Sequence, residues 1–201
     1  MKKTYFIIGL FGLFFLTLRN EIEPVSIDKN FIPEISIDIP STKYTKLNDL
    51  IQNKIDKIKS ELKEKTINNN YELNINYQKY TYYNFISYAF FIETYTGGAH
   101  PKHDIFTIVF NKENNKFIDI NTLIKYNVKT LNVFSNYSRF NLIYDNRIVD
   151  VNMLLEGTLP KIDNFKNFVF SDNIIIFFKE YQIAPYNSGI ISLDVPYYMI
   201  K

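Results

Sequence analysis

The feature that most constrains the fold is a series of strand-like segments joined by very short turns. Apolar and polar residues alternate strictly over residues 71–78, and residues 85–96 are apolar at nearly every position before Glu93. Alternation is typical of a half-buried strand, and a continuous apolar run is typical of a central strand covered on both faces. Two further strand patterns follow at residues 105–110 and 117–120. Because parallel strands need long crossover connections, these short turns predict an antiparallel meander.

A strand pattern and a helical pattern precede the meander. Residues 35–39 alternate strictly between apolar and polar, as a half-buried strand does. From Thr45 to Leu62 the apolar residues recur at the spacing of one helix face, while most of the charged residues lie off that face. Thr45 is the expected N-cap of this helix, and Asn68–Asn70 are the expected stop.

Helices and aromatic strands are expected after the meander. Asn121 is the expected cap of a helical region that extends to Phe134, and a second helix over residues 148–155 is expected to end at Gly157. Closing strands are expected at residues 174–178 and 190–198. The sequence therefore predicts an α+β fold of antiparallel β-sheets with helices packed on one face, in one body or in two small lobes.

The first residues are typical of an export signal. Lys2 and Lys3 precede an apolar stretch over residues 5–18, which is short for a free-standing transmembrane helix. We therefore interpret residues 1–20 as a signal peptide or a signal anchor and residues 21–34 as a tether. The remainder divides into an N-terminal half, 35–98, and a C-terminal half, 99–201. The expected location is extracytoplasmic: secreted, periplasmic or anchored by residues 5–18, with membrane contact only through that segment.

Charge and cysteine content exclude several function classes. The chain has 23 basic and 21 acidic residues, and without residues 1–20 it keeps 20 basic ones and all 21 acidic ones. Such a balance is not the footprint of a nucleic-acid-binding protein. The absence of cysteine excludes disulfides, thiol catalysis and zinc–thiolate sites.

One turn carries both histidines of the chain. Gly97 and Gly98 permit a sharp reversal between strands, and Pro101 restricts the backbone on either side of it. In one interpretation Gly97, Gly98, His100 and Pro101 form a purely structural turn. In the other, His100 and His103, with Glu93 and Asp104 nearby, form a metal or acid–base site, although two histidines outside a regular helix are weak metal candidates.

No catalytic constellation stands out elsewhere. A serine hydrolase would need His100 or His103, and there is no Gly-x-Ser-x-Gly elbow. The single glycine pair lacks the spacing of a phosphate-binding loop. Paired carboxylates for glycoside cleavage remain open, with Glu93, Asp104 and Glu180 as candidates. We expect no catalytic residue and no cofactor.

Two motifs resemble a known family. The segment Tyr95-Thr-Gly-Gly-Ala-His-Pro101 resembles a signature of the extracytoplasmic domain of RsiV-type anti-sigma factors, which also precedes the catalytic module of PdaC-type peptidoglycan deacetylases. The segment Tyr181-Gln-Ile-Ala-Pro-Tyr186, followed by Gly189 and Val195-Pro-Tyr197, is similar to the closing pattern of the same family. The resemblance covers about residues 33–198.

The resemblance implies an α+β domain that is not an enzyme and that, in RsiV-type proteins, binds lysozyme as a ligand. Carried over, Tyr181, Pro185, Tyr186 and Gly189 are the candidate ligand-binding residues, with Pro185 stiffening the loop and Tyr186 supplying contact area. The alternative is that Ala184-Pro185 only turns the chain and Tyr186 fills the core.

The chain also departs from both family types. Only Met1 to Thr4 precede the apolar stretch, where an anti-sigma factor needs a cytoplasmic segment, and no deacetylase module follows Lys201. We therefore expect an exported, non-catalytic cell-envelope domain that binds a protein such as lysozyme or another muramidase, as a sensor or inhibitor. Peptidoglycan is a further possible partner. The alternatives are an envelope hydrolase or metal-dependent enzyme, and a cell-wall glycan-binding module.

Overall fold

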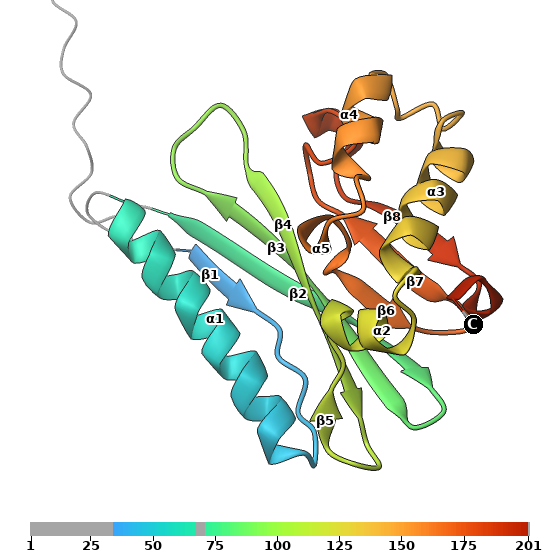
Figure 1. Cartoon of the computed structure of the whole chain (residues 1–201). Coiled ribbons are helices and arrows are strands. Elements are labelled where there is room, and N and C mark those ends of the chain that lie inside the picture. Colours follow the sequence, from blue (N-terminus) through green and yellow to red (C-terminus); the bar gives the residue numbers. More distant parts are fainter. Residues whose placement is uncertain (1–33, 67–70, 201) are drawn as a thin grey trace, which may run out of the picture. The chain divides into compact units, whose positions relative to one another are not determined.

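The computed structural model describes residues 34–66 and 71–200, which form two β-sheets and the helices packed on them (Figure 1). The expected leader at residues 1–20, nearly all of the expected tether, and the expected helix stop at Asn68–Asn70 lie outside the described residues. None of the described helices has the length and apolar character that a membrane crossing requires.

The five-stranded sheet has the order β1-β2-β3-β4-β5. Its strands are β1 (Glu34–Ile37), β2 (Glu72–Tyr82), β3 (Phe85–Tyr95), β4 (Lys102–Asn111) and β5 (Lys116–Phe117). From β2 to β5 each strand pairs antiparallel with the next, which confirms the predicted meander. β1 instead pairs parallel with β2, because the helix between them supplies the crossover that a parallel pair needs. The sheet is therefore mixed.

Helix α1 (Thr45–Lys65) covers one face of this sheet. Its Leu47, Ile51 and Ile55 are fully buried and pack against β2 and β3. Burial of each such side chain contributes about 1.5–3 kcal/mol. The predicted N-cap is wrong: Tyr44 is the cap residue and Thr45 is the first helical residue. The preceding turn is fixed by Thr42, whose hydroxyl donates to Asn48 Oδ1 at 2.7 Å.

The three-stranded sheet packs on the opposite face of the five-stranded sheet. It has the order β6-β7-β8 and is antiparallel, with strands β6 (Phe168–Phe170), β7 (Ile174–Phe178) and β8 (Ile191–Val195). Val169 and Phe177 face Ala89 and Ile105 between the two sheets. On the outer side, Ile174, Ile176 and Phe178 lie in one apolar cluster with Phe134 and Phe165 of the helices.

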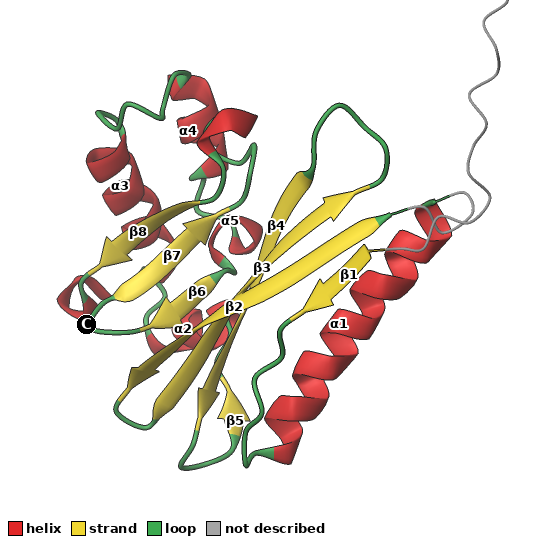
Figure 2. Ribbon diagram, turned by 180° about the vertical axis from the view of Figure 1, so that it is seen from behind, coloured by secondary structure: helices red, strands yellow, loops and turns green. Residues whose placement is uncertain are grey.

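Four short helices cover that outer side: α2 (Ile120–Tyr126), α3 (Thr130–Leu142), α4 (Val151–Gly157) and α5 (Ile162–Phe165). Two 3₁₀ turns follow, η2 (Tyr186–Ser188) and η3 (Tyr197–Ile200). Each sheet therefore has helices on one face only, and the fold is α+β, as predicted. Figure 2 shows the same arrangement from behind, with α1 and the short helices at opposite sides of the sheets.

The start of the C-terminal helices differs from the prediction. The expected strand at residues 117–120 stops at Phe117, and the N-cap of α2 is Asp119, not Asn121. The Asp119 carboxylate accepts from the backbone N–H of Thr122 at 2.8 Å and from its hydroxyl at 2.7 Å. These bonds satisfy the first turn and pull the chain out of the sheet. The expected single helix then divides into α2 and α3, because the Thr130 hydroxyl donates to the carbonyl of Asn127 at 2.6 Å and holds a turn there.

Candidate functional site

Part of the five-stranded sheet presents a polar surface on the side opposite α1. The strand register places Ser36, Asn74, Glu93 and His103 in one row across β1 to β4. The next row consists of Glu34, Glu72 and Tyr95. Two small cavities, of about 220 and 120 Å³, lie over these rows, and Gly189 and Ile190 line the larger one.

This surface is acidic, and we call Glu34, Glu72 and Glu93, with Ser36, Asn74 and Asn76, the acidic face. No lysine or arginine is among the described residues that line the two cavities. Glu34 and Glu72 are exposed and directly opposite each other in the β1–β2 ladder. Like charges opposite each other destabilise a sheet, so a positively charged partner would relieve a cost that the fold carries here.

His103 connects the acidic face to the C-terminal part of the chain. Its Nε2 lies 3.2 Å from Glu93 Oε2, and its Nδ1 lies 3.7 Å from Glu180 Oε1. The backbone N–H of His103 donates to the other Glu180 oxygen at 2.8 Å. The Glu180 side chain is only 3% exposed. At 3.7 Å the imidazole Nδ1 is beyond hydrogen-bond distance of Glu180 Oε1, so the backbone N–H of His103 is the group that holds the Glu180 carboxylate.

Tyr186 covers the two histidines. Its ring centroid lies 3.8 Å from that of His100 and 5.9 Å from that of His103, and Tyr181 is 6.2 Å away. Burial, followed by the charge of Glu180, raises the pKa of the Tyr186 phenol, so the hydroxyl is neutral at physiological pH. Tyr186 is half-buried against these rings, so the alternative in which it fills the core does not hold.

The loop that presents Tyr186 is anchored to remote parts of the chain. Gln182 Nε2 donates to the carbonyls of Gly157 and Asn164, both at 2.9 Å. The Ser188 hydroxyl donates to the carbonyl of Arg147 at 3.2 Å. These bonds fix the loop at its beginning and its end.

Within the loop, two residues adopt a left-handed backbone conformation. Tyr181 and Gly189 both have φ of 62°, which is unstrained only for the glycine. Pro185 precedes η2 as its N-cap and carries no side-chain capping bond. The candidates Tyr181, Pro185, Tyr186 and Gly189 therefore belong to one loop at the edge of the acidic face.

The glycine turn forms as predicted. Gly97 has φ of 87°, and Gly97, Gly98 and His100 are exposed between β3 and β4. The Nδ1–H of His100 donates to the carbonyl of Pro101 at 2.9 Å, which orients the ring toward Tyr186. The turn therefore has a structural part, the glycines, and a part that contributes to the site, the histidines.

The three candidate carboxylates for glycoside cleavage do not all lie together. Asp104 pairs with Lys179 at 2.5 Å and so does not join Glu93 and Glu180, which both contact His103. Within residues 34–66 and 71–200, no three side chains of the metal-binding types are grouped as a metal site requires. We call His100, His103, Tyr181 and Tyr186, with Glu93 and Glu180, the tyrosine–histidine site.

Sequence reasoning missed the acidic face. Glu72, Asn74 and Asn76 are the polar positions of the alternating segment 71–78, so the pattern predicted that they share one face. It did not predict that β1 adds Glu34 and Ser36 beside them, because the pairing of β1 is fixed by the helical crossover.

A solved structure from Pseudomonas aeruginosa PAO1 supports the fold of this chain. Residues 109–198 match the family model "Protein of unknown function (DUF3298)". A DUF3298 family protein of Pseudomonas aeruginosa PAO1 is 11% identical with a TM-score of 0.64, over 84% of this chain and 83% of that one. A DUF3298 family member of Bacteroides fragilis NCTC 9343 is 20% identical with a TM-score of 0.49, over 81% and 69%. No curated protein matches the chain. The matched segment includes the loop of Tyr186 but not the glycine turn.

Proposed function

We propose that this chain is an exported, non-catalytic cell-envelope domain that binds a cationic protein, such as lysozyme or another muramidase, at the tyrosine–histidine site. The observation that carries the proposal is the meeting of the two motif segments, with Tyr186 stacked on His100 and Glu180 held against His103. These are the same two segments in which the sequence resembles the RsiV-type and PdaC-type domains.

The site has the features of a protein-binding surface. Tyrosines supply large contact area with few rotatable bonds, so little conformational entropy is lost when they are covered. The loop is already fixed by Gln182 and Ser188, so little ordering is needed on binding. A partner that covered Tyr181 and Tyr186 would also reach the acidic face, because the loop residues Gly189 and Ile190 line its cavity.

Charge supports a basic partner. The acidic face carries three glutamates without a lysine or arginine among the described residues of its cavities. Complementary charge accelerates association and makes it sensitive to salt. Lysozyme, a basic protein, therefore fits this surface better than an acidic or neutral protein does. The same proposal places the domain outside the cytoplasm, as the basic and apolar residues 2–18 indicate. It also includes a sensor or inhibitor role.

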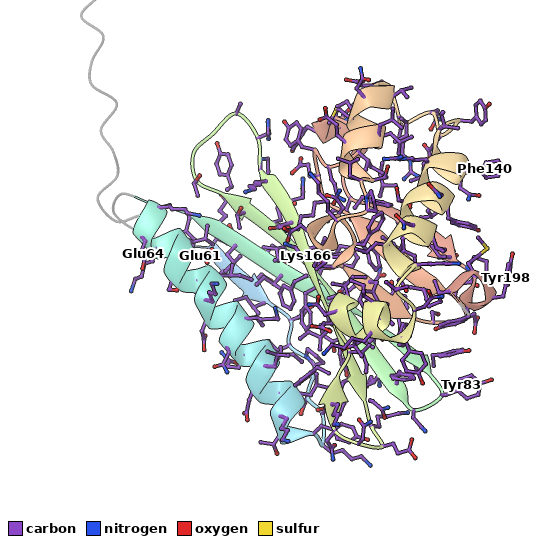
Figure 3. The ribbon with its side chains drawn as sticks, in the orientation of Figure 1. Glu61, Glu64, Tyr83, Phe140, Lys166 and Tyr198 are labelled. Carbon is purple, nitrogen blue, oxygen red and sulfur yellow. The ribbon has the colours of Figure 1, made fainter. Side chains whose placement is uncertain are left out.

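A second candidate function, binding of cell-wall glycan, is favoured by a different surface. Tyr82 stacks on Tyr197 with ring centroids 4.4 Å apart, and both line a cavity of about 600 Å³ with Tyr126 and Val128. Tyr83 and Tyr198 project outward nearby and are 81% and 70% exposed (Figure 3). Flat aromatic faces with hydroxyl groups suit the apolar faces and hydroxyls of sugars.

The test is a calorimetric titration of the purified protein with hen egg-white lysozyme. We expect saturable one-to-one binding that Tyr186→Ala weakens about tenfold or more. Tyr144→Ala is the matched control, because Tyr144 is 93% exposed and lies outside the site. The double variant Glu34→Gln, Glu72→Gln should weaken binding at low salt and lose its effect at high salt.

Three outcomes separate the alternatives. Absence of binding at high micromolar lysozyme would overturn the lysozyme proposal. Retention on insoluble peptidoglycan that is lost in Tyr126→Ala but kept in Tyr186→Ala would favour the glycan module. Stoichiometric bound metal that His100→Ala removes would favour a metal-dependent enzyme instead.

A further inference from the structure

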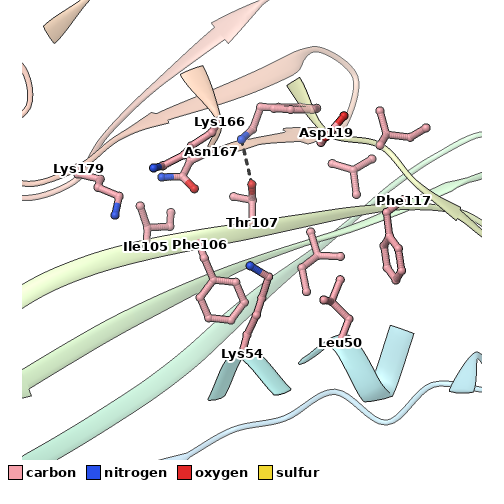
Figure 4. A pocket seen from close by; sticks show the side chains of 14 residues that line it. Leu50, Lys54, Ile105, Phe106, Thr107, Phe117, Asp119, Lys166, Asn167 and Lys179 are labelled. Atoms are coloured by element: carbon pink, nitrogen blue, oxygen red, sulfur yellow. Dashed lines mark hydrogen bonds between the residues drawn. The ribbon is translucent and has the colours of Figure 1, made fainter. Parts of the chain in front are cut away.

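The outer edge of β4 is open along most of its length. β5 pairs with β4 only at Phe110 and Asn111, and the last contact is the Ile118 N–H to the Val109 carbonyl at 2.9 Å. The chain then leaves the sheet at Asp119 to begin α2. A cavity of about 410 Å³ lies along the edge from Ile105 to Val109, and we call it the β4 groove (Figure 4).

The backbone of this edge points unpaired groups into the groove. In an antiparallel ladder, alternate residues direct both their N–H and their C=O to the same side. The bonds of His103 N–H to Glu180 and of Val109 C=O to Ile118 show that the odd-numbered residues of β4 face outward. The N–H of Ile105 is taken by Asp104 Oδ1 at 2.7 Å. Both backbone groups of Thr107 and the carbonyl of Ile105 therefore face the groove, and no described strand pairs with them.

The groove is apolar at its base, and lysine side chains lie on both of its walls. Leu50 and Lys54 come from α1, Lys166 follows α5, and Lys179 follows β7. Phe106, Phe117 and Phe168 supply apolar surface between them. Figure 4 shows Lys54 and Leu50 on one side of the β4 ribbon and Lys166, Asn167 and Lys179 on the other.

Three lysines and one aspartate line the groove, and two of the lysines are paired with carboxylates beyond the lining. Lys166 pairs with Asp163 at 2.9 Å and Lys179 pairs with Asp104. Lys54 lies over the ring of Phe106, 5.3 Å from its centroid, and no described carboxylate is within ion-pair distance of it. Burial, and then the charges of Lys57 and Lys166, lower the pKa of the Lys54 ammonium. Asp119, the acid in the lining, is already used as the cap of α2.

These lysines do not have the placement that protects an edge from aggregation. Protective lysines usually lie on the edge strand itself, where they oppose the approach of another strand. Residues 104–109 of β4 contain no lysine or arginine, and the three lysines come from the elements on either side. They leave the edge accessible and can contact the side chains of a strand laid along it.

We propose that the β4 groove binds an extended acidic peptide segment of a partner protein, which adds to the sheet antiparallel to β4 and in line with β5. Its backbone would pair with Thr107 and Ile105, as in other cases of strand addition. Its side chains would alternate between the α1 wall, with Lys54, and the opposite wall, with Lys166 and Lys179. This site shares no residue with the tyrosine–histidine site and takes a partner of opposite charge.

The first probe is the peptide acetyl-Val-Glu-Val-Glu-Val-Glu-amide, titrated into the purified protein and followed by amide NMR. We expect saturable shifts centred on Thr107, and binding about tenfold tighter than that of the peptide with lysine in place of each glutamate. The double variant Lys54→Gln, Lys166→Gln should weaken binding about tenfold. Lys125→Gln is the control, because Lys125 is exposed on α2 outside the groove.

A second probe separates strand addition from charge attraction alone. The same acidic peptide with its four central amides N-methylated keeps every charge but cannot pair with a strand edge. We expect it to bind about tenfold more weakly. Equal binding of the methylated peptide, equal binding of the lysine peptide, or the absence of shifts at Thr107 with the unmethylated peptide would each overturn the proposal.

Discussion

The two chain segments that meet at the tyrosine–histidine site are held in place in different ways. The glycine turn, residues 95–103, belongs to a hairpin whose ladder sets Glu93 opposite His103. A methyl group added at Gly97 would meet no atom within 4 Å. The loop 179–189 depends instead on distant residues: Gln182 is bound to Gly157 and Asn164, and Ser188 to Arg147.

This contrast predicts which substitutions should alter the site. The shape of the turn is determined by its own residues and by the strands on either side, so a change within it should stay local. The shape of the loop is determined by contacts that span 18 to 41 residues of the chain. Substitutions far from Tyr186 should therefore alter binding at the site, provided that they act on these anchors.

The largest effect is expected for Gly157→Ala. A Cβ on Gly157 would lie 1.9 Å from the backbone oxygen of Gln182 and 2.8 Å from the Ile183 side chain, so α4 and the loop must move apart. We expect a loss of about 3 kcal/mol or more in the free energy of unfolding, measured by urea denaturation. Lysozyme binding by the folded fraction should weaken as well, because the loop loses its Gln182 anchor.

Gly97→Ala is the matched control for this substitution. It places the same methyl group in open space, so its cost is the backbone strain of φ near 87°, about 1 kcal/mol. Peptide binding at the β4 groove should persist in Gly97→Ala, because that turn contributes no residue to the groove. If Gly97→Ala destabilised the protein as much as Gly157→Ala, the distinction between a local turn and a remotely anchored loop would be wrong.

A smaller effect is expected from acid, through the other anchor of the loop. Hydrogen bonds from Arg147 lower the pKa of Asp145 from 3.8 to about 2. A lowered carboxyl pKa means stability that is fully present above pH 3.8 and is lost as the pH falls toward 2. Because the Arg147 side chain is 44% exposed, solvent screening limits the contribution to about 1 kcal/mol.

The measurement is the free energy of unfolding against pH for the protein and for Asp145→Asn. The two curves should differ at neutral pH and converge as the pH falls below 3.8 toward 2. Since Arg147 also accepts the hydrogen bond from Ser188, lysozyme binding should weaken slightly in Asp145→Asn. A constant difference between the curves at all pH values would contradict the assignment of this stability to the ionised Asp145 carboxylate.

Periodicity predicted the fold well wherever one face of an element is buried. α1 and β2 to β4 lie where the sequence placed them, because their apolar residues recur at the helical or strand spacing. The parallel pairing of β1 and the early end of β5 were missed. Both depend on local choices, a crossover and an Asp119 cap, that apolar spacing does not record.

Only one half of the candidate site could be predicted from the sequence. Once Gly97 and Gly98 are taken as the hairpin turn, the register brings Glu93 to His103 without further information. The contact of His100 with Tyr186 depends on how the three-stranded sheet packs on the five-stranded one, because the two rings belong to segments on different sheets. Only the resemblance to a known family singled out both segments, and it did not say that they touch.

The smallest effect, and the most specific one, is expected for Tyr181→Asn. Tyr181 adopts φ of 62° with a side chain that is 57% exposed, so the loop carries backbone strain for a ring that contributes little to the core. Asparagine tolerates this conformation, and we expect a gain of about 0.5 kcal/mol in the free energy of unfolding. Lysozyme binding should nevertheless weaken about threefold or more, because the ring beside Tyr186 is lost.

Tyr83→Asn is the control: Tyr83 has φ of 46° at the tip of the β2–β3 hairpin, away from the site, so it should gain similar stability and leave binding unchanged. If the strain at Tyr181 were retained only for packing, Tyr181→Asn would instead lose stability and leave lysozyme binding unchanged.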